Sequence, residues 1–342
     1  HGVRRARQTP EALEARRLKE KSKLRDYLAL TDNVLARKKR NDWSSEALHA
    51  TTQLLQVNPE FYTIWNYRRH ILVKGMFPDS TPEKIKNLLD DDLALTMAAL
   101  KIHPKVYWIW THREWCLKNV PNGPGTEDDG DARGWEKELW NQELFVVEKL
   151  LDADPRNFHA WSYRRLVLES MPIPKSELSE LAYTTKKIES NFSNFSAWHQ
   201  RSKVLTSLWS KGQLDETQSK EEGKSHSQHT QFELVHNAMY TDPNDQSVWI
   251  YHRWLVGTGD SRDVLEREIA VIHGLLEEET DSKWCMESLV HYKRLLLRKH
   301  ASFVDKSLLT QECIHLLEQL RKVDPGRGAR YDEIGEVNGY PQ

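Results

Sequence analysis

The sequence predicts an all-α fold, an α-solenoid or crescent-shaped superhelix of about seven helical hairpins that forms a single domain over residues 1–342. Three observations predict it. Five segments align on a tryptophan, an amphipathic stretch with helical spacing precedes each of them, and alternation of β-branched residues is not sustained anywhere. Because a single hairpin of this kind cannot bury its apolar face alone, repeated copies are expected to stack on one another.

The five segments share a proline, replaced by Phe192 in the fourth, and a tryptophan six residues later. They read NPEFYTIWNYRRHIL, HPKVYWIWTHREWCL, DPRNFHAWSYRRLVL, NFSNFSAWHQRSKVL and DPNDQSVWIYHRWLV, and their tryptophans are Trp65, Trp110, Trp161, Trp198 and Trp249. Two weaker copies place Trp284 and Tyr331 at the same position. Tryptophans at a fixed place in repeated units are expected in the core of each hairpin rather than on a ligand-stacking surface.

Each Asx-Pro pair is expected to end one helix and to begin the next, because the residue before a proline is disfavoured in helical backbone. Asn58, Asp154 and Asp242 would then cap the second helix of their hairpins, with the proline at its first position. The preceding helix is predicted from stretches such as WNQELFVVEKLLDA, in which Leu144 and Val147 share a face.

The repeats are predicted over residues 43–335, after an N-terminal helical segment at 1–42. Two stretches read as loops. Residues 120–134 are rich in glycine, proline and acidic residues, and residues 209–230 are polar with few apolar side chains.

The composition excludes several classes of protein. Lysine and arginine number 49 against 51 aspartates and glutamates, a net charge of −2, which argues against a nucleic-acid-binding protein. No apolar run reaches the roughly 18 residues of a membrane span, and no secretory signal is seen. The three cysteines lie far apart and suggest neither a disulfide framework nor a cysteine-based metal site. We therefore expect a cytoplasmic protein.

An arginine follows the tryptophan by three or four residues in every good copy, on the same face of the predicted helix. These are Arg68, Arg113, Arg164, Arg201 and Arg253. We expect each to bind a carboxylate or helix-end carbonyls of a neighbouring repeat, with anion binding as the alternative.

Lys105 does not follow from the repeat. It stands just after the proline of the second copy, where a helix dipole disfavours a cation. Arg156 takes the equivalent place in the third copy, and the other copies have Glu60, Ser193 and Asn244 there. If equivalent positions line one edge, five residues converge beside two helix N-termini, where anions bind. They are Lys105, Tyr107, Arg156, Asn157 and His159. The alternative is a Lys105 that merely extends to solvent.

Familiar catalytic patterns are missing from the sequence. It contains no DDxxD, HExxH, P-loop or GxSxG motif, and its run of Asp90, Asp91 and Asp92 is not spaced to hold Mg²⁺ like an isoprenoid synthase. The chain therefore reads as a scaffold, and any catalysis in which it takes part must depend mostly on groups located elsewhere.

The repeat of proline, tryptophan and arginine resembles the α subunits of the protein prenyltransferases over nearly the whole chain. The stretches NFSNFSAWHQRS and TDPNDQSVWIYHRWLV make it most similar to the Rab geranylgeranyltransferase (type II) members. The resemblance implies a heterodimer in which the α subunit wraps a β subunit that carries a catalytic zinc and the lipid pocket. It also implies geranylgeranyl diphosphate as substrate, Rab GTPases as acceptors at their C-terminal cysteines, and a Rab escort protein as a further partner.

The same resemblance implies roles for individual residues. A Lys-x-Tyr after the proline of one repeat reaches the isoprenoid diphosphate in this family, and here it matches Lys105 and Tyr107. An Asn-Tyr-His stretch of the next repeat corresponds to Asn157, Phe158 and His159, so the tyrosine hydroxyl is lost. No metal ligand is expected in this chain, apart from His1 as a possible ligand or lid for the zinc of the partner.

Two other functions stay open at this point. One is the α subunit shared by farnesyltransferase and geranylgeranyltransferase type I. The other is a non-catalytic adaptor of the tetratricopeptide kind, whose repeats of about 34 residues vary little in length, unlike the spacings of 37 to 51 residues between the tryptophans here.

Overall fold

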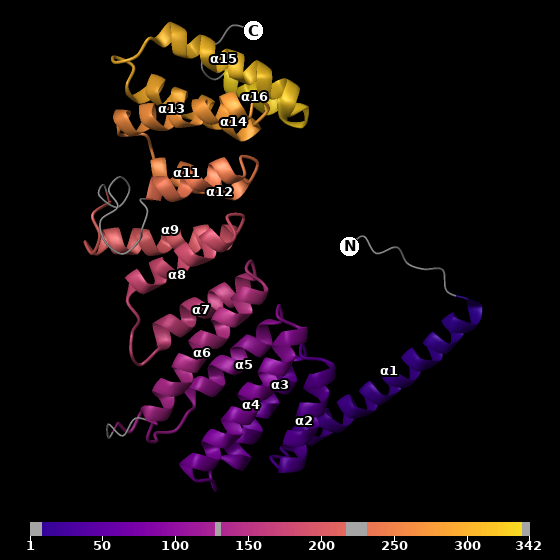
Figure 1. Cartoon of the computed structure of the whole chain (residues 1–342). Helices are drawn as coiled ribbons and strands as arrows, with labels where there is room; N and C mark the ends of the chain where they lie inside the picture. Colours follow the sequence, from indigo (N-terminus) through magenta and orange to yellow (C-terminus); the bar gives the residue numbers. More distant parts are fainter. Residues whose placement is uncertain (1–8, 127–130, 217–230, 337–342) are drawn as a thin grey trace. The chain divides into compact units, whose positions relative to one another are not determined.

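The computed structural model describes residues 9–126, 131–216 and 231–336, and it is helical apart from turns and loops (Figure 1). Within these residues there is no β-strand, and none of the helices combines the length and hydropathy that a membrane crossing requires. The chain divides into two compact units, which meet between Pro174 and Lys175 in the sequence. The single domain over 1–342 stays a prediction.

The N-terminal unit contains a long first helix and three hairpins. Its helices are α1 (Pro10–Lys39), α2 (Ser45–Val57), α3 (Tyr62–Ile71), α4 (Pro82–Ile102), α5 (Tyr107–Lys118), α6 (Gly134–Ala153) and α7 (Phe158–Ser170), with a π-helix at Leu72–Met76. Figure 1 shows α2 with α3, α4 with α5 and α6 with α7 as antiparallel pairs. Helix α5 packs on both α3 and α7, so the second helices of the hairpins form one stacked layer.

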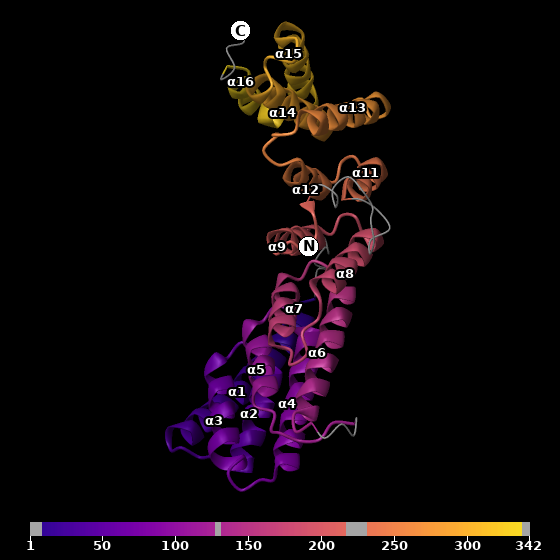
Figure 2. The same cartoon turned by 90° about the vertical axis from the view of Figure 1, so that its left-hand side faces the viewer.

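The C-terminal unit repeats this arrangement with four hairpins (Figure 2). Its helices are α8 (Glu177–Ser190), α9 (Phe195–Ser210), α11 (Gln231–Thr241), α12 (Gln246–Val256), α13 (Arg262–Glu278), α14 (Lys283–Lys299), α15 (Lys306–Val323) and α16 (Gly328–Glu336), with a 3₁₀ turn at Pro325–Arg327. Helix α12 packs on α9 and α14, and α14 also packs on α15. The described residues therefore confirm an all-α fold of helical hairpins, with three stacked in the first unit and four in the second.

The repeated tryptophans lie in the hairpin cores, as predicted. Each indole N–H donates a hydrogen bond to the backbone carbonyl six residues earlier, at the proline position. The donor–acceptor distance is 2.8 Å from Trp65 to Pro59 and 2.7 Å from Trp198 to Phe192. A buried indole needs such a partner, and this bond fixes the turn to the first turn of the second helix in each copy.

The predicted caps are wrong by three residues. Asn58 ends α2 instead of starting α3, and its side chain accepts from the backbone N–H of Glu60 at 3.1 Å. This Asx turn places the proline in the connection between the helices. The N-caps of the second helices lie further along the chain. In α9 and α12 they are Asn194 and Asp245, whose side chains accept from Ala197 N and Ser247 N.

The placement of Trp284 at the repeated tryptophan position is also wrong. Helix α14 begins at Lys283, capped by Ser282, so its fourth residue is Met286, and Met286 is the buried side chain in this copy. Trp284 is only half-buried and lies under the guanidinium of Arg327. Tyr331, by contrast, is buried at the expected position, where its hydroxyl donates to Glu287 and Asp324.

Both loops are shorter than predicted, because the flanking helices extend into the predicted ranges. Gly134 already belongs to α6, and Trp209 and Ser210 belong to α9. At the two ends of the first loop, Gly123 and Gly134 lie where backbone and ring atoms pass too close for a side chain: a Cβ on Gly134 would come within 1.9 Å of Gly125 N. Residues 127–130 and 217–230 of the two loops, and His1, lie outside the described residues.

Candidate functional site

The turns that precede α5 and α7 bring the predicted anion-binding residues together in the N-terminal unit. Lys105 follows the proline of the first turn, and Tyr107 is the first residue of α5. Arg156 is exposed in the equivalent turn, Asn157 caps α7, and His159 is the second residue of that helix. Adjacent hairpins therefore bring Tyr107 to His159 and Asn157 to the turn that holds Lys105.

The aromatic ring of Tyr107 rests against the imidazole of His159. Their ring centres are 4.3 Å apart with an angle of 76° between the planes, an edge-to-face contact. His159 is buried, whereas Tyr107 is 62% exposed. The buried imidazole thus contacts one side of the tyrosine ring, and the rest of the tyrosine remains accessible to a ligand.

Lys105 is an exposed cation of this site. Its side chain is 69% exposed, and its Nζ lies 3.8 Å from Asp154 Oδ2. Burial lowers the pKa of His159, and the positive charge of Lys105 lowers that pKa further. The imidazole is therefore mainly neutral near pH 7, and the lysine supplies the positive charge.

Asn157 links the two turns. It is 3% exposed, and its Oδ1 accepts from the backbone N–H of His159 at 3.0 Å. Its Nδ2 donates to the carbonyl of Pro104, the residue before Lys105, at 3.2 Å. Both ends of the side-chain amide are thus engaged within the protein, which suits a residue that positions Lys105 better than one that binds a ligand.

A pocket of about 200 Å³ opens beside Tyr107, between α5 and α7. Its lining includes Tyr107, Trp110, Phe158, His159, Tyr163 and Leu166. This pocket was not predicted from the sequence. The signal that could have indicated it is the helical spacing of Tyr107, Trp110, Thr111 and Glu114 on one face of α5.

The repeated arginines mostly connect neighbouring hairpins, as expected. Arg68 donates to both carboxylate oxygens of Asp92 in the next hairpin, and Arg113 donates to Glu143 at 2.7 Å. Arg201 donates to the side-chain oxygen of Gln231 at 2.8 Å. We call each of these contacts an inter-hairpin tie. All three arginines also donate to a backbone carbonyl of the first helix in their own hairpin.

The structure also describes one contact at this kind of position in each of the other two copies. Arg164 pairs with Glu148 of its own hairpin at 3.1 Å. In the fifth copy the tie is made by His252, which is three residues after Trp249, and not by Arg253. The expectation for Arg253 is therefore wrong. A residue three positions after the tryptophan points at the next hairpin, whereas Arg253 lies four positions after it.

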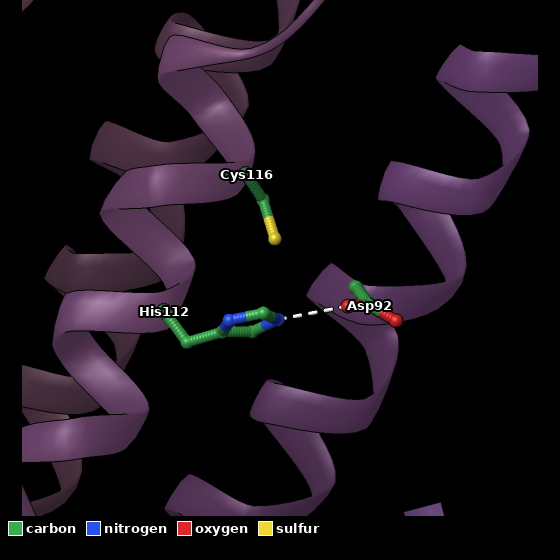
Figure 3. A group of neighbouring side chains, drawn as sticks. All are labelled: Asp92, His112 and Cys116. Atoms are coloured by element: carbon green, nitrogen blue, oxygen red, sulfur yellow. Dashed lines mark hydrogen bonds and ion pairs between the residues drawn. The ribbon is translucent and has the colours of Figure 1, made fainter. Parts of the chain in front are cut away.

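One tie adjoins a buried group of potential metal ligands, Asp92, His112 and Cys116 (Figure 3). His112 Nε2 lies 2.8 Å from Asp92 Oδ2. Burial lowers the pKa of His112 and raises the pKa of the Cys116 thiol well above its ordinary value. With the guanidinium of Arg68 on both oxygens of the carboxylate, these residues suit a hydrogen-bonded ion pair rather than a metal centre.

The comparisons with known proteins agree with the fold and the repeat. The family described as "Protein prenyltransferase alpha subunit repeat" matches residues 44–74, 89–120, 140–171, 178–208 and 229–258. Among solved structures, Candida albicans protein geranylgeranyltransferase-I complexed with GGPP is similar at a TM-score of 0.66, with 22% sequence identity, over 90% of this chain and 89% of that one. This likeness shows the fold.

Two fungal relatives match almost end to end. The geranylgeranyl transferase type-2 subunit alpha of Schizosaccharomyces pombe is 36% identical over 98% of both chains, and that of Saccharomyces cerevisiae is 36% identical over 97% of both. The human protein of the same name is 36% identical over 78% of this chain and 43% of its own length.

A helical-hairpin scaffold with these repeats defines a class: the chain belongs to the protein prenyltransferase α subunits. Within this class, the relatives that it matches over nearly their whole length are the α subunits of geranylgeranyl transferase type 2. This membership decides against an adaptor of the tetratricopeptide kind.

Proposed function

We propose that this chain is the α subunit of a heterodimeric geranylgeranyl transferase type 2, acting in the cytoplasm. It would bind a β subunit that carries zinc and the lipid pocket, and together they would transfer geranylgeranyl from its diphosphate to C-terminal cysteines of Rab GTPases presented by an escort protein. The observation that supports this most is the near end-to-end similarity to the type-2 α subunits of two yeasts.

The reaction forms a thioether. The cysteine sulfur, after losing its proton, attacks C1 of the geranylgeranyl group, the bond from C1 to the diphosphate oxygen breaks, and the diphosphate leaves with the electron pair. The zinc of the partner subunit would supply a lowered pKa for the thiol. The part proposed for this chain is to stabilise the charge that grows on the leaving diphosphate.

Lys105 and Tyr107 are the groups proposed for that part. The ammonium of Lys105 would offset the growing negative charge, and the hydroxyl of Tyr107 would donate a hydrogen bond to it. Because the pair of Lys105 with Asp154 is exposed and 3.8 Å long, it holds the lysine only weakly. A diphosphate, with its larger charge, would therefore displace Asp154 from the lysine.

His159, Asn157 and Arg156 would have supporting roles. His159 holds the ring of Tyr107, and Asn157 fixes the carbonyl just before Lys105. Arg156 would add a second exposed cation at the same edge. The backbone N–H groups at the start of α5 and α7 also favour an anion between the two turns.

A single substitution tests the role of Lys105. Purified with its β subunit, the Lys105→Ala variant is expected to transfer geranylgeranyl about 10²–10³-fold more slowly in a single turnover, because one donor to a developing charge is lost. Association of the two subunits should be unchanged. Lys118→Ala, which removes the same charge from the opposite end of α5, is the matched control.

An unchanged single-turnover rate in Lys105→Ala would remove this residue from the site. The function itself is tested by co-expressing the chain with candidate β subunits and comparing transfer to Rab plus escort protein with transfer to a CaaX peptide. Activity only on the peptide would instead indicate the α subunit shared by farnesyltransferase and geranylgeranyltransferase type I. The proposal would be refuted if no candidate β subunit bound the chain and no transfer to either substrate were detected.

A further inference from the structure

Three potential metal ligands meet at one point in the C-terminal unit. They are His236 from α11, His252 from α12 and Glu268 from α13. Glu268 Oε2 lies 2.7 Å from His236 Nε2 and 2.8 Å from His252 Nε2. The three ligand atoms all lie within 4.8 Å of one another. We call these residues the His-His-Glu cluster.

The cluster occupies the position of an inter-hairpin tie. In two other hairpins the arginine of the tie also binds a threonine sixteen residues earlier: Arg68 binds Thr52 and Arg201 binds Thr185. In the fifth hairpin His252 replaces the arginine, and sixteen residues earlier His236 replaces the threonine. Two imidazoles thus stand where those hairpins have a guanidinium and a hydroxyl.

This replacement changes what the carboxylate oxygen faces. A guanidinium carries a permanent charge and only donates hydrogen bonds, so it excludes a metal ion from the tie. Two imidazole nitrogens and a carboxylate oxygen, by contrast, are donors that zinc takes in protein sites. In the sequence, the neighbouring Arg253 aligns with the other arginines, and only the structure shows that His252 takes their place.

Outer contacts hold the cluster in this geometry. The hydroxyl of Tyr292 lies 2.7 Å from His252 Nδ1, which leaves Nε2 directed at the shared oxygen. Arg267 Nε donates to the other oxygen of Glu268, Oε1, at 2.9 Å. Partners of this kind orient ligands in established metal sites, because they fix the ring and the carboxylate while one atom of each remains for the metal.

Burial gives the cluster one open side. Glu268 and His252 are fully buried, and the side chain of His236 is 23% exposed. An ion could therefore enter past His236. In a tetrahedral zinc site with bonds of about 2.0–2.2 Å, ligand atoms are about 3.3 Å apart, so side-chain shifts on the order of 1 Å would suffice.

We propose that His236, His252 and Glu268 bind a divalent transition metal, zinc foremost, with the fourth position open to water on the side of His236. On binding, each imidazole keeps one proton on Nδ1, and that of His252 is donated to the Tyr292 hydroxyl. The ion connects the fifth hairpin to α13, as Arg68 connects the first hairpin to α4. This site is additional to the zinc proposed for the β subunit.

The test uses the full-length chain without any β subunit, stripped with a chelator and titrated with Co²⁺ and then Zn²⁺. One equivalent of Co²⁺ is expected to give the visible absorption of a four-coordinate site, and Zn²⁺ is expected to displace it and to raise the midpoint of thermal unfolding. His236→Gln, a change at a partly exposed side chain, should weaken Co²⁺ binding by at least about tenfold.

The matched control is His315→Gln, a change of an exposed histidine on α15. It should bind Co²⁺ like the unsubstituted chain. No absorption and no metal-dependent shift in the unsubstituted chain would overturn the proposal, and so would equal binding by His236→Gln. Since the chain is measured alone, these outcomes concern the cluster and leave the proposed transferase function to its own test.

Discussion

In the N-terminal unit the tie from the first hairpin to the second is made by the guanidinium of Arg68, whereas from the fifth hairpin to the sixth it is made by the imidazole of His252. The carboxylates are alike. Burial alone would raise the pKa of Asp92 and of Glu268. Hydrogen bonds and nearby charge outweigh burial, so both pKa values are lowered. At Asp92 the partners are His112 and Arg68, and at Glu268 they are His236 and His252.

The difference lies in what happens when the partner is lost or changes its charge. Asp92 depends on a cation that cannot be deprotonated in proteins, so its charge is always balanced. At Oε2, Glu268 depends on two histidines that can be neutral, charged or bound to a metal, and its permanent cation is the partly exposed Arg267 at Oε1. The same place in the repeat can thus hold a fixed connection or a conditional one, and three predictions test this contrast.

The largest expected effect comes from removing the fixed cation. Arg68→Ala leaves the carboxylate of Asp92 buried with only the neutral His112 beside it, and we expect the free energy of unfolding to fall by about 3–5 kcal/mol. Urea denaturation followed by circular dichroism measures this. Arg16→Ala, which breaks an exposed pair with Glu20 on α1, should change stability by less than about 1 kcal/mol. A similar small loss in both variants would remove the contrast.

A smaller effect is expected in the C-terminal unit. Glu268→Gln in the metal-free chain leaves two imidazoles that can stay neutral, so no uncompensated charge is buried. We expect a loss of about 1–3 kcal/mol, the cost of unmade hydrogen bonds, in the same denaturation experiment. A loss as large as that of Arg68→Ala would mean that the histidines are charged in the folded chain.

The smallest effect concerns pH. Burial lowers the pKa of His112 below its ordinary value of 6.5, although Asp92 opposes this. A histidine with a lowered pKa takes up protons more readily when unfolded, so its contribution to stability is complete above pH 6.5 and declines as the pH falls below that value. The decline cannot exceed about 1.4 kcal/mol per pH unit.

Denaturation at pH 7.5 and pH 5.5 measures this contribution. The unsubstituted chain should lose more stability between the two values than His112→Gln does, since the variant has no group to titrate at this position. An equal loss in both would show that other groups cause the pH dependence.

The hairpins could be predicted from the sequence because the tryptophan and the proline position are joined by a hydrogen bond of local range, which keeps their spacing constant. In the sixth copy both the proline and the tryptophan are missing, since Met286 holds the core position, and Trp284 two residues earlier was predicted there instead. The caps were misplaced because an Asx turn and an N-cap use the same side chains. Only the structure distinguishes the two at Asn58.

The convergence of Lys105, Tyr107 and His159 could also be predicted, because stacking places equivalent turns side by side. The role of the Asn157 amide could not. Asn194 is the equivalent cap of α9, yet its Nδ2 is buried without a hydrogen-bond partner, whereas that of Asn157 donates to Pro104. The residue and its place in the repeat are the same in both copies, so the repeat alone does not predict the bond that Asn157 makes.

The bond from each indole to the carbonyl at the proline position has a consequence for how such a chain can change. It anchors the start of the second helix from within the hairpin itself, so the length of the connection to the next hairpin does not affect it. Insertions and deletions in these connections are therefore tolerated, which the spacings of 37 to 51 residues already reflect. A tag or a small domain grafted into the first loop, between α5 and α6, should leave every anchor in place.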